Sequence, residues 1–156
     1  MKIKIISIGK IKETFYLQAQ AEYVKLLGRY CDVIITEVAG EPLDGVRSEK
    51  QLEAAREAEG RRARQKLTGF VVACDMSGRK LTSEGFSRMI EEIMQKNSTV
   101  TFVTGGSAGL SRELLDAAGT VVSFSDMTLP HRLFRIVLLE QVYRAFKIMR
   151  GETYHK

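Results

Sequence analysis

The chain has 156 residues, a length typical of one domain that buries a sizeable core without cross-links. Hydrophobic residues make up 44% of it, charged residues 28%, and the net charge is +5, which describes an ordinary soluble globular protein. No apolar run approaches the roughly 18 residues of a membrane span, so we expect no membrane partner.

Two features favour a cytoplasmic location. The opening segment, residues 1–10, has a short apolar run and no cleavage site, so we expect a strand there and not a signal peptide. Cys31 and Cys74 are the two cysteines, both in strand-like surroundings, which suggests reduced, buried thiols. No Cys/His cluster has the spacing of a metal site, so we expect no metal.

The order of the elements predicts the fold class. Strands are expected where β-branched and apolar residues run together, and helices where apolar residues recur every three to four positions. In 13–30 the apolar residues from Phe15 to Leu27 recur at the helical period and are expected on the buried face. Ser48 and Gln51 have the spacing of a capping box, and the helix they begin is expected to pack an alanine-rich face on the sheet. Expected strands are 2–8, 32–38, 70–74, 99–104 and 119–123; expected helices are 13–30, 48–66, 83–95, a short one after 110, and 131–150; residues 75–80 are expected to form a turn. The alternation predicts a single α/β domain, 1–156, with a mostly parallel sheet and helices on both faces.

The last helix is unusual in composition and charge. Apolar residues nearly encircle it, although one stripe is enough to pack on a sheet. We therefore expect the second stripe to form a homodimer interface. Residues 131–156 also carry six lysines and arginines against two glutamates, a surplus that suits either a phosphate-bearing partner or a solvated helix face.

The glycine turn at 105–109 has two interpretations. It matches G-x-S-x-G after a strand, and Asp126 with His131 or His155 follows in the order of a serine hydrolase with Ser107 as nucleophile. Alternatively, the missing Cβ atoms of Gly105 and Gly106 allow a ligand to approach the backbone near the next helix N-terminus.

A second polar loop follows the next strand, at residues 123–131. A helix N-cap needs only one or two of its polar residues. The remaining hydroxyl and backbone groups, beside apolar Met127 and Leu129, suit an adenosine-like ligand. Ligands of open α/β sheets bind at such strand ends, so both loops predict one pocket.

Four segments carry a resemblance to a known family: KIKIISIGKIK, FVTGGSAGL, FSDMTLPHRL and VLLEQVYRAFKIMRGETYHK. Together they resemble the ribosomal RNA large subunit methyltransferase H family, of the SPOUT class of AdoMet-dependent methyltransferases. The resemblance implies a C-terminal deep trefoil knot, S-adenosyl-L-methionine as methyl donor, and methylation of N3 of a pseudouridine in large-subunit rRNA of the assembled ribosome. A non-catalytic ribosome-binding protein is a further alternative.

The resemblance also assigns residues to roles. We expect the tail to complete the active site at the dimer interface, and the cations to grip phosphate or stabilise a developing anion. Implied cofactor-binding residues are Cys74, Gly105, Phe124, Ser125, Asp126, Met127, Thr128 and Leu129; expected catalytic residues are His155, Tyr154 and Arg144; expected RNA-binding residues are Arg135 and Lys156.

Overall fold

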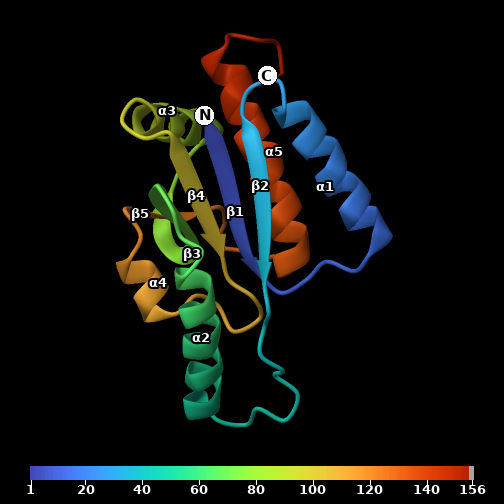
Figure 1. The fold of residues 1–156 in the computed structure, drawn as a ribbon, viewed down its shortest axis with the longest axis vertical. Coiled ribbons are helices and arrows are strands. Elements are labelled where there is room, and N and C mark those ends of the chain that lie inside the picture. Colours follow the sequence, from blue (N-terminus) through green and yellow to red (C-terminus); the bar gives the residue numbers. More distant parts are fainter. Residues whose placement is uncertain (155–156) are drawn as a thin grey trace.

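The computed structural model describes residues 1–154 and shows strands alternating with helices along the whole of that range (Figure 1). The strands are β1 (Lys2–Ile8), β2 (Asp32–Val38), β3 (Phe70–Lys80), β4 (Thr99–Thr104) and β5 (Thr120–Ser123). The helices are α1 (Thr14–Leu27), α2 (Glu49–Arg64), α3 (Ser83–Met94), α4 (Arg112–Asp116) and α5 (His131–Met149). The strands pair in parallel in the order β2-β1-β4-β3-β5, which confirms the predicted parallel α/β sheet.

Helices cover both faces of the sheet, as predicted. Helices α1, α3 and α5 bury large apolar side chains against one face, and α2 and α4 pack on the other. The Ser48–Gln51 capping box is present at the start of α2. Both thiols are free and buried, and burial raises the pKa of Cys31 to about 12, so this thiol is protonated and inert at neutral pH.

The predicted turn at 75–80 is wrong. Strand β3 continues through it, with a register shift between Cys74 and Arg79 after which Arg79 and Lys80 pair with Val122 and Ser123 of β5. Cys74 and Arg79 both lie opposite Val122, so residues 75–78 form an irregularity within β3, and the pairing with the edge strand resumes after it. The irregularity bends β3 beside the end of β5.

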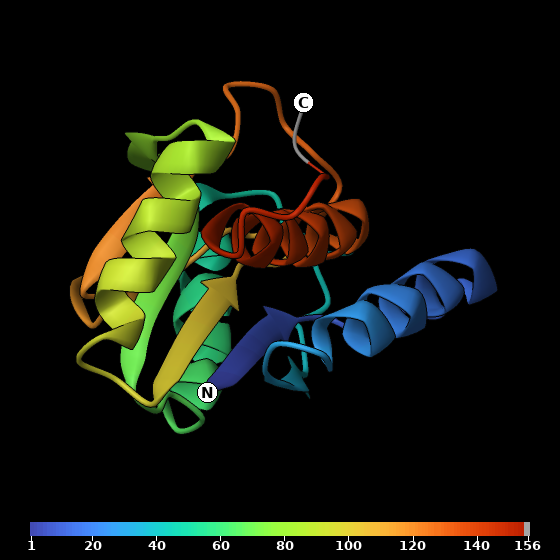
Figure 2. The same ribbon diagram turned by 90° about the horizontal axis from the view of Figure 1, so that it is seen from above.

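Helix α5 lies between α1 and α3, both of which contact it. Its apolar residues therefore pack on the sheet and on two helices within one protomer, so the encircling pattern does not itself require a second subunit. Helix α1 extends away from the body of the molecule (Figure 2). Phe15, predicted to lie on the buried face of α1, is 62% exposed because the first turns of the helix lie beyond the sheet.

Candidate functional site

A cleft of about 610 Å³ opens where the carboxyl ends of β3, β4 and β5 meet. Two chain segments form most of its wall: the turn from Gly105 to Leu110 after β4 and the loop from Phe124 to Pro130 after β5. The parallel pairing of these strands brings both segments to the same edge of the sheet. The two loops singled out in the sequence thus form one site, and its volume lies in the range of small-molecule pockets, about 300–1,000 Å³.

Seven of the eight expected cofactor-binding residues line this cleft: Cys74, Gly105, Phe124, Ser125, Met127, Thr128 and Leu129. Cys74 is the last residue of β3 before its register shift, and its burial raises the pKa of the thiol, so it presents an uncharged sulfur. A Cβ on Gly105 would lie 2.8 Å from the carbonyl carbon of Gly109, so this glycine is needed to close the turn itself. From the sequence, the missing Cβ of Gly105 had been attributed to the close approach of a ligand.

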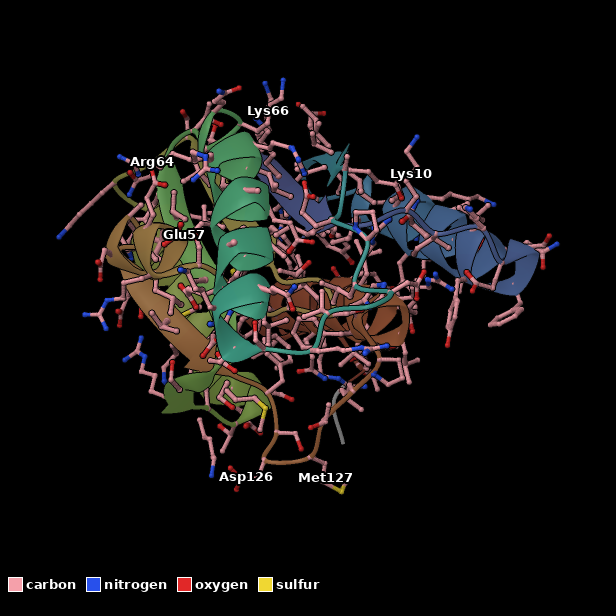
Figure 3. All side chains as sticks on the ribbon, turned by 90° about the horizontal axis from the view of Figure 1, so that it is seen from below. Lys10, Glu57, Arg64, Lys66, Asp126 and Met127 are labelled. Carbon is pink, nitrogen blue, oxygen red and sulfur yellow. The ribbon has the colours of Figure 1, made fainter. Side chains whose placement is uncertain are left out.

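Asp126 differs from the expectation. Its side chain is 77% exposed and forms an ion pair with Lys80, and it is not among the residues that line the cleft. Figure 3 shows Asp126 and Met127 at the outer bend of the loop. The resemblance gave a continuous run of contacts, whereas the outer bend of the loop turns the Asp126 side chain toward Lys80 and away from the cleft.

The backbone of the same loop offers hydrogen-bond donors. The Ser125 hydroxyl accepts from the Met127 N–H at 2.9 Å, which holds the bend. The N–H groups of Thr128 and Leu129 donate to no acceptor within residues 1–154. Two unused donors beside apolar side chains are suited to the polar edge of an aromatic heterocycle.

Helix α2 supplies a wall of the cleft that the sequence did not indicate. Leu52 and Arg56 line it, and Arg56 Nε donates to the Ala108 carbonyl oxygen at 2.7 Å. Glu49 and Glu53 pair with the same guanidinium. Arg56 therefore ties the glycine turn to α2 and fixes the separation of the two walls, a long-range contact with no local sequence signal.

His131, the first residue of α5, also lines the cleft. Its imidazole rests against Gly9, where a Cβ would lie 3.6 Å from Nε2. Burial, followed by the neighbouring charges of Arg132 and Arg135, lowers the pKa of His131 below its ordinary value of 6.5. The ring is therefore neutral at physiological pH.

Among the described residues, the serine hydrolase alternative lacks its geometry; His155, its other candidate base, lies outside them. Ser107 is exposed, and no hydrogen bond within residues 1–154 joins it to His131 or Asp126. Asp126 instead pairs with Lys80. A serine hydroxyl without a base is a weak nucleophile, so the described residues do not form a triad.

Two of the expected catalytic residues cluster farther along α5. Both Arg144 Nε and Nη2 donate to Glu140 Oε1, at 2.9 and 2.6 Å, and the guanidinium lies 4.7 Å from the centroid of the Tyr154 ring. Burial, and then the charge of Glu140, raises the pKa of Tyr154, so its phenol stays protonated and donates to Glu140 at 3.3 Å. At about 1.5 Å per residue, Arg144 lies roughly 20 Å along the helix from His131.

The other predicted tail residues, His155 and Lys156, lie outside the described residues. Arg135 differs from its expectation as an RNA contact, because it is 2% exposed. Its guanidinium donates to Glu37 at 2.7 Å, to Gln20 at 3.2 Å and to the Gly9 carbonyl oxygen at 3.1 Å. It joins α5 to β1, β2 and α1, and leaves no accessible surface for a phosphate.

The basic surplus of the C-terminal segment is partly neutralised in the fold. Arg132, Arg135, Arg144 and Lys147 each form an ion pair with a glutamate, and Arg150 faces the ring of Tyr30. Composition could not show this, because two of the partners, Glu13 and Glu37, come from the other end of the chain. Within residues 1–154, no group of His, Cys, Asp and Glu side chains is arranged to hold a metal ion, and no helix has the length and hydrophobicity of a membrane span.

Comparisons with known proteins identify the family of the chain. A family described as "Predicted SPOUT methyltransferase" matches residues 1–155. Proteins named ribosomal RNA large subunit methyltransferase H are 49% identical in Clostridium botulinum (strain Kyoto / Type A2) and 47% identical in Clostridium perfringens (strain 13 / Type A), each over 100% of both chains.

Solved structures share the fold at low sequence identity. A probable methylase family protein from Haemophilus influenzae has a TM-score of 0.55 at 12% identity, covering 99% of this chain and 70% of that one. The tRNA (m1G37) methyltransferase from Aquifex aeolicus has a TM-score of 0.51 at 13% identity, covering 92% and 70%. A putative methyltransferase from Legionella pneumophila, in complex with bound SAM, has a TM-score of 0.50 at 12% identity, covering 94% and 66%.

Proposed function

Because the chain belongs to the SPOUT methyltransferase family, within its ribosomal RNA large subunit methyltransferase H group, we propose that it methylates large-subunit rRNA with S-adenosyl-L-methionine as donor. The observation that carries the proposal is the joining of the glycine turn and the Phe124–Pro130 loop in one cleft. The proposed acceptor is N3 of a pseudouridine, on the assembled ribosome, with the enzyme in the cytoplasm. The chain is proposed to be a homodimer with a trefoil knot formed by its C-terminal segment.

The residues of the cleft fit the donor. The N–H groups of Thr128 and Leu129 can donate to the adenine ring, and Leu110 and Leu129 offer apolar contact for its faces. The neutral state of His131 also matters, because an imidazolium here would repel a sulfonium cation. Two neutral groups, Cys74 and His131, therefore line a site for a positively charged ligand.

The bound donor supplies a methyl group whose carbon–sulfur bond breaks as a carbon–nitrogen bond forms, and the N3 proton must leave. The chain holds the two partners in line and excludes water. A cation near the acceptor stabilises the imide anion as the proton departs, and Arg144, held charged by Glu140, is the candidate within residues 1–154. Protonated Tyr154 can donate a hydrogen bond to the same anion, and His155 is the proposed proton acceptor.

Two variants test this division of labour. Thr128→Arg places a long cation in the wall of the cleft and is expected to weaken S-adenosyl-L-methionine binding by about tenfold or more in calorimetry. Thr14→Arg, an exposed position at the start of α1, is the matched control and should leave the affinity unchanged. Deleting Tyr154–Lys156 is expected to abolish transfer of labelled methyl groups to ribosomes while donor affinity stays within about threefold.

The results separate the alternatives. Equal affinity in Thr128→Arg and Thr14→Arg would reject the cleft as the donor site. Donor binding without methyl transfer by the wild-type protein would favour a non-catalytic ribosome-binding protein. Mass spectrometry of rRNA from cells lacking the protein identifies the methylated base, and loss of a methyl group from a nucleotide other than pseudouridine would reject the proposed acceptor.

A further inference from the structure

A second cavity, of about 210 Å³, lies behind the loop that walls the donor cleft. Ser123, Phe124 and Leu129 line both hollows, so the two hollows adjoin at this loop. The far side of the cavity is formed by the start of α3, through Thr82, Ser83 and Phe86, and by Val137 and Gln141 of α5. Neither the family resemblance nor the sequence motifs indicated that α3 contributes to the site.

The geometry points to this cavity as the pocket for the target nucleobase, with Gln141 as the residue that reads its edge. The inference rests on the proposed rRNA methylation. It adds a binding site and a specificity-determining residue for the base, and it places the acceptor beside the donor cleft, where the two hollows adjoin.

Size and shape support a single flat ring. A volume of about 210 Å³ lies below the range of sites for drug-sized ligands, about 300–1,000 Å³, and suits a fragment such as one six-membered heterocycle. Phe124 is held by edge-to-face contacts with Phe86 at 5.4 Å and Phe134 at 5.0 Å between ring centroids. An aromatic wall in a fixed orientation is what an extruded base stacks upon.

The polar side of the cavity carries an incompletely used amide. Ser83 Oγ donates to Gln141 Oε1 at 2.9 Å, and Gln141 Nε2 donates to Glu140 Oε2 at 2.7 Å. A primary amide has two N–H donors and two acceptor positions, so one of each remains for a ligand. Such a pair complements an adjacent N–H and C=O on a heterocycle edge.

Pseudouridine offers such an edge that does not include N3, whereas the one N–H of the uridine ring is N3–H itself. In pseudouridine the ribose is attached to carbon, so N1 carries a hydrogen next to the C2 carbonyl; in uridine N1 is bonded to the sugar. Pairing of N1–H and O2 with Gln141 leaves N3, on the other side of the carbonyl, free to face the donor. A site that hydrogen-bonds a substrate N–H discriminates strongly against the analogue that lacks it.

The cavity is also connected to the candidate catalytic residues. Gln141 bonds Glu140, and Glu140 accepts from both Arg144 and Tyr154. Phe134, Val137, Gln141 and Arg144 follow a spacing of three to four residues, so they lie along one stripe of α5 from the donor cleft to the arginine. This order, donor, base and cation, is what transfer to a ring nitrogen requires.

Filling the cavity is the first test. Val137→Phe adds volume to its α5 side and is expected to lower kcat/KM for methyl transfer to ribosomes by about tenfold or more, with S-adenosyl-L-methionine affinity within about threefold of wild type. Leu17→Phe, on the exposed side of α1, is the matched control for added volume and should transfer normally. Normal transfer by Val137→Phe would overturn the inference.

The second test replaces Gln141, the residue proposed to recognise the edge of the base. Wild-type enzyme should prefer ribosomes with pseudouridine at the target over ribosomes with uridine there, and Gln141→Leu is expected to reduce this preference by about tenfold or more. A structural defect alone would slow both substrates equally, so an unchanged ratio, or no preference in the wild type, would overturn the role of Gln141. No transfer by the wild type to either kind of ribosome would instead reject the proposed function itself.

Discussion

Helices α2 and α5 both begin at the carboxyl edge of the sheet and both line the donor cleft, yet they pack on opposite faces by different means. Helix α5 buries large side chains, among them Leu138, Leu139 and Phe146. Helix α2 buries small residues and approaches its neighbours through its backbone. The α5 wall of the site is thus packed by large side chains, whereas the α2 wall requires small ones.

The two helices also treat buried charge differently. Arg135 of α5 donates to Glu37, Gln20 and the Gly9 carbonyl oxygen, and only its Nε lacks a partner among the described residues. Glu59 of α2 accepts only from the Glu41 N–H, and its Oε2 has no partner among the described residues. A buried charge with partners stabilises a junction, whereas one without them costs free energy.

The largest effect is expected from truncation on the α5 side. Leu138 is fully buried, so Leu138→Ala should leave a cavity and lower the free energy of unfolding by roughly 2–5 kcal/mol. Urea unfolding followed by circular dichroism measures it. Leu17→Ala, at a position 41% exposed, is the control and should change stability little. A small loss in Leu138→Ala would mean that α5 does not depend on close packing.

An intermediate effect is expected from adding one methyl group on the α2 side. A Cβ on Gly60 would lie 2.1 Å from Ser111 Oγ and 2.7 Å from its Cβ. Gly60→Ala should therefore lower the unfolding free energy by about 1–3 kcal/mol, although alanine is the better helix former. The double variant Gly60→Ala/Ser111→Gly removes both contacting atoms, and recovery of stability relative to Gly60→Ala would identify the overlap as the cause. Equal stability of the two variants would contradict it.

The smallest effect, a gain, is expected from Glu59→Gln. Burial raises the pKa of Glu59, opposed by the Glu41 N–H, so the folded state binds this proton more tightly than the unfolded state. The stability contributed by the protonated group is then lost as pH rises through the folded-state pKa, and the carboxylate costs stability at pH 7. Glutamine keeps the acceptor without the charge and should add about 1 kcal/mol.

The pH dependence provides the check on this variant. The gain from Glu59→Gln should be present in urea unfolding at pH 7 and should disappear near pH 4, where Glu59 itself is protonated. Glu57→Gln, an exposed position on the same helix, should show no gain at either pH (Figure 3). A gain that is equal at both pH values would show that charge burial is not its origin.

Much of the fold was predictable because it depends on the local spacing of apolar residues along the chain. The buried strands β1 and β4, the capping box of α2 and the alanine-rich face of that helix follow from residue spacing alone. The prediction failed at residues 75–80, where β3 resumes its pairing with β5 at Arg79 and Lys80, and at Phe15, which the helical period placed on the buried face. Both errors arise because period and composition do not show how far a neighbouring element extends.

The site was predictable in part for the same reason. Loops that follow adjacent parallel strands meet at one edge, so the Gly105 turn and the Phe124–Pro130 loop could be joined in advance. Arg56 and the cavity beside Gln141 could not, since they depend on contacts between residues about 50–60 positions apart. The resemblance supplied the knot and the pseudouridine, and the composition of the last helix suggested the dimer; all three remain predictions.

By itself the sequence determined the alternation of strands and helices, the parallel sheet and the two loops at its edge, because these depend on local spacing and on the direction of neighbouring strands. Only the tertiary structure decided which charged side chains remain available to bind a ligand. Glu13 and Glu37, from the first quarter of the chain, neutralise Arg132 and Arg135 of the last helix. A charge in sequence acts on a ligand only if no opposite charge folds against it, and that is a property of distance in space.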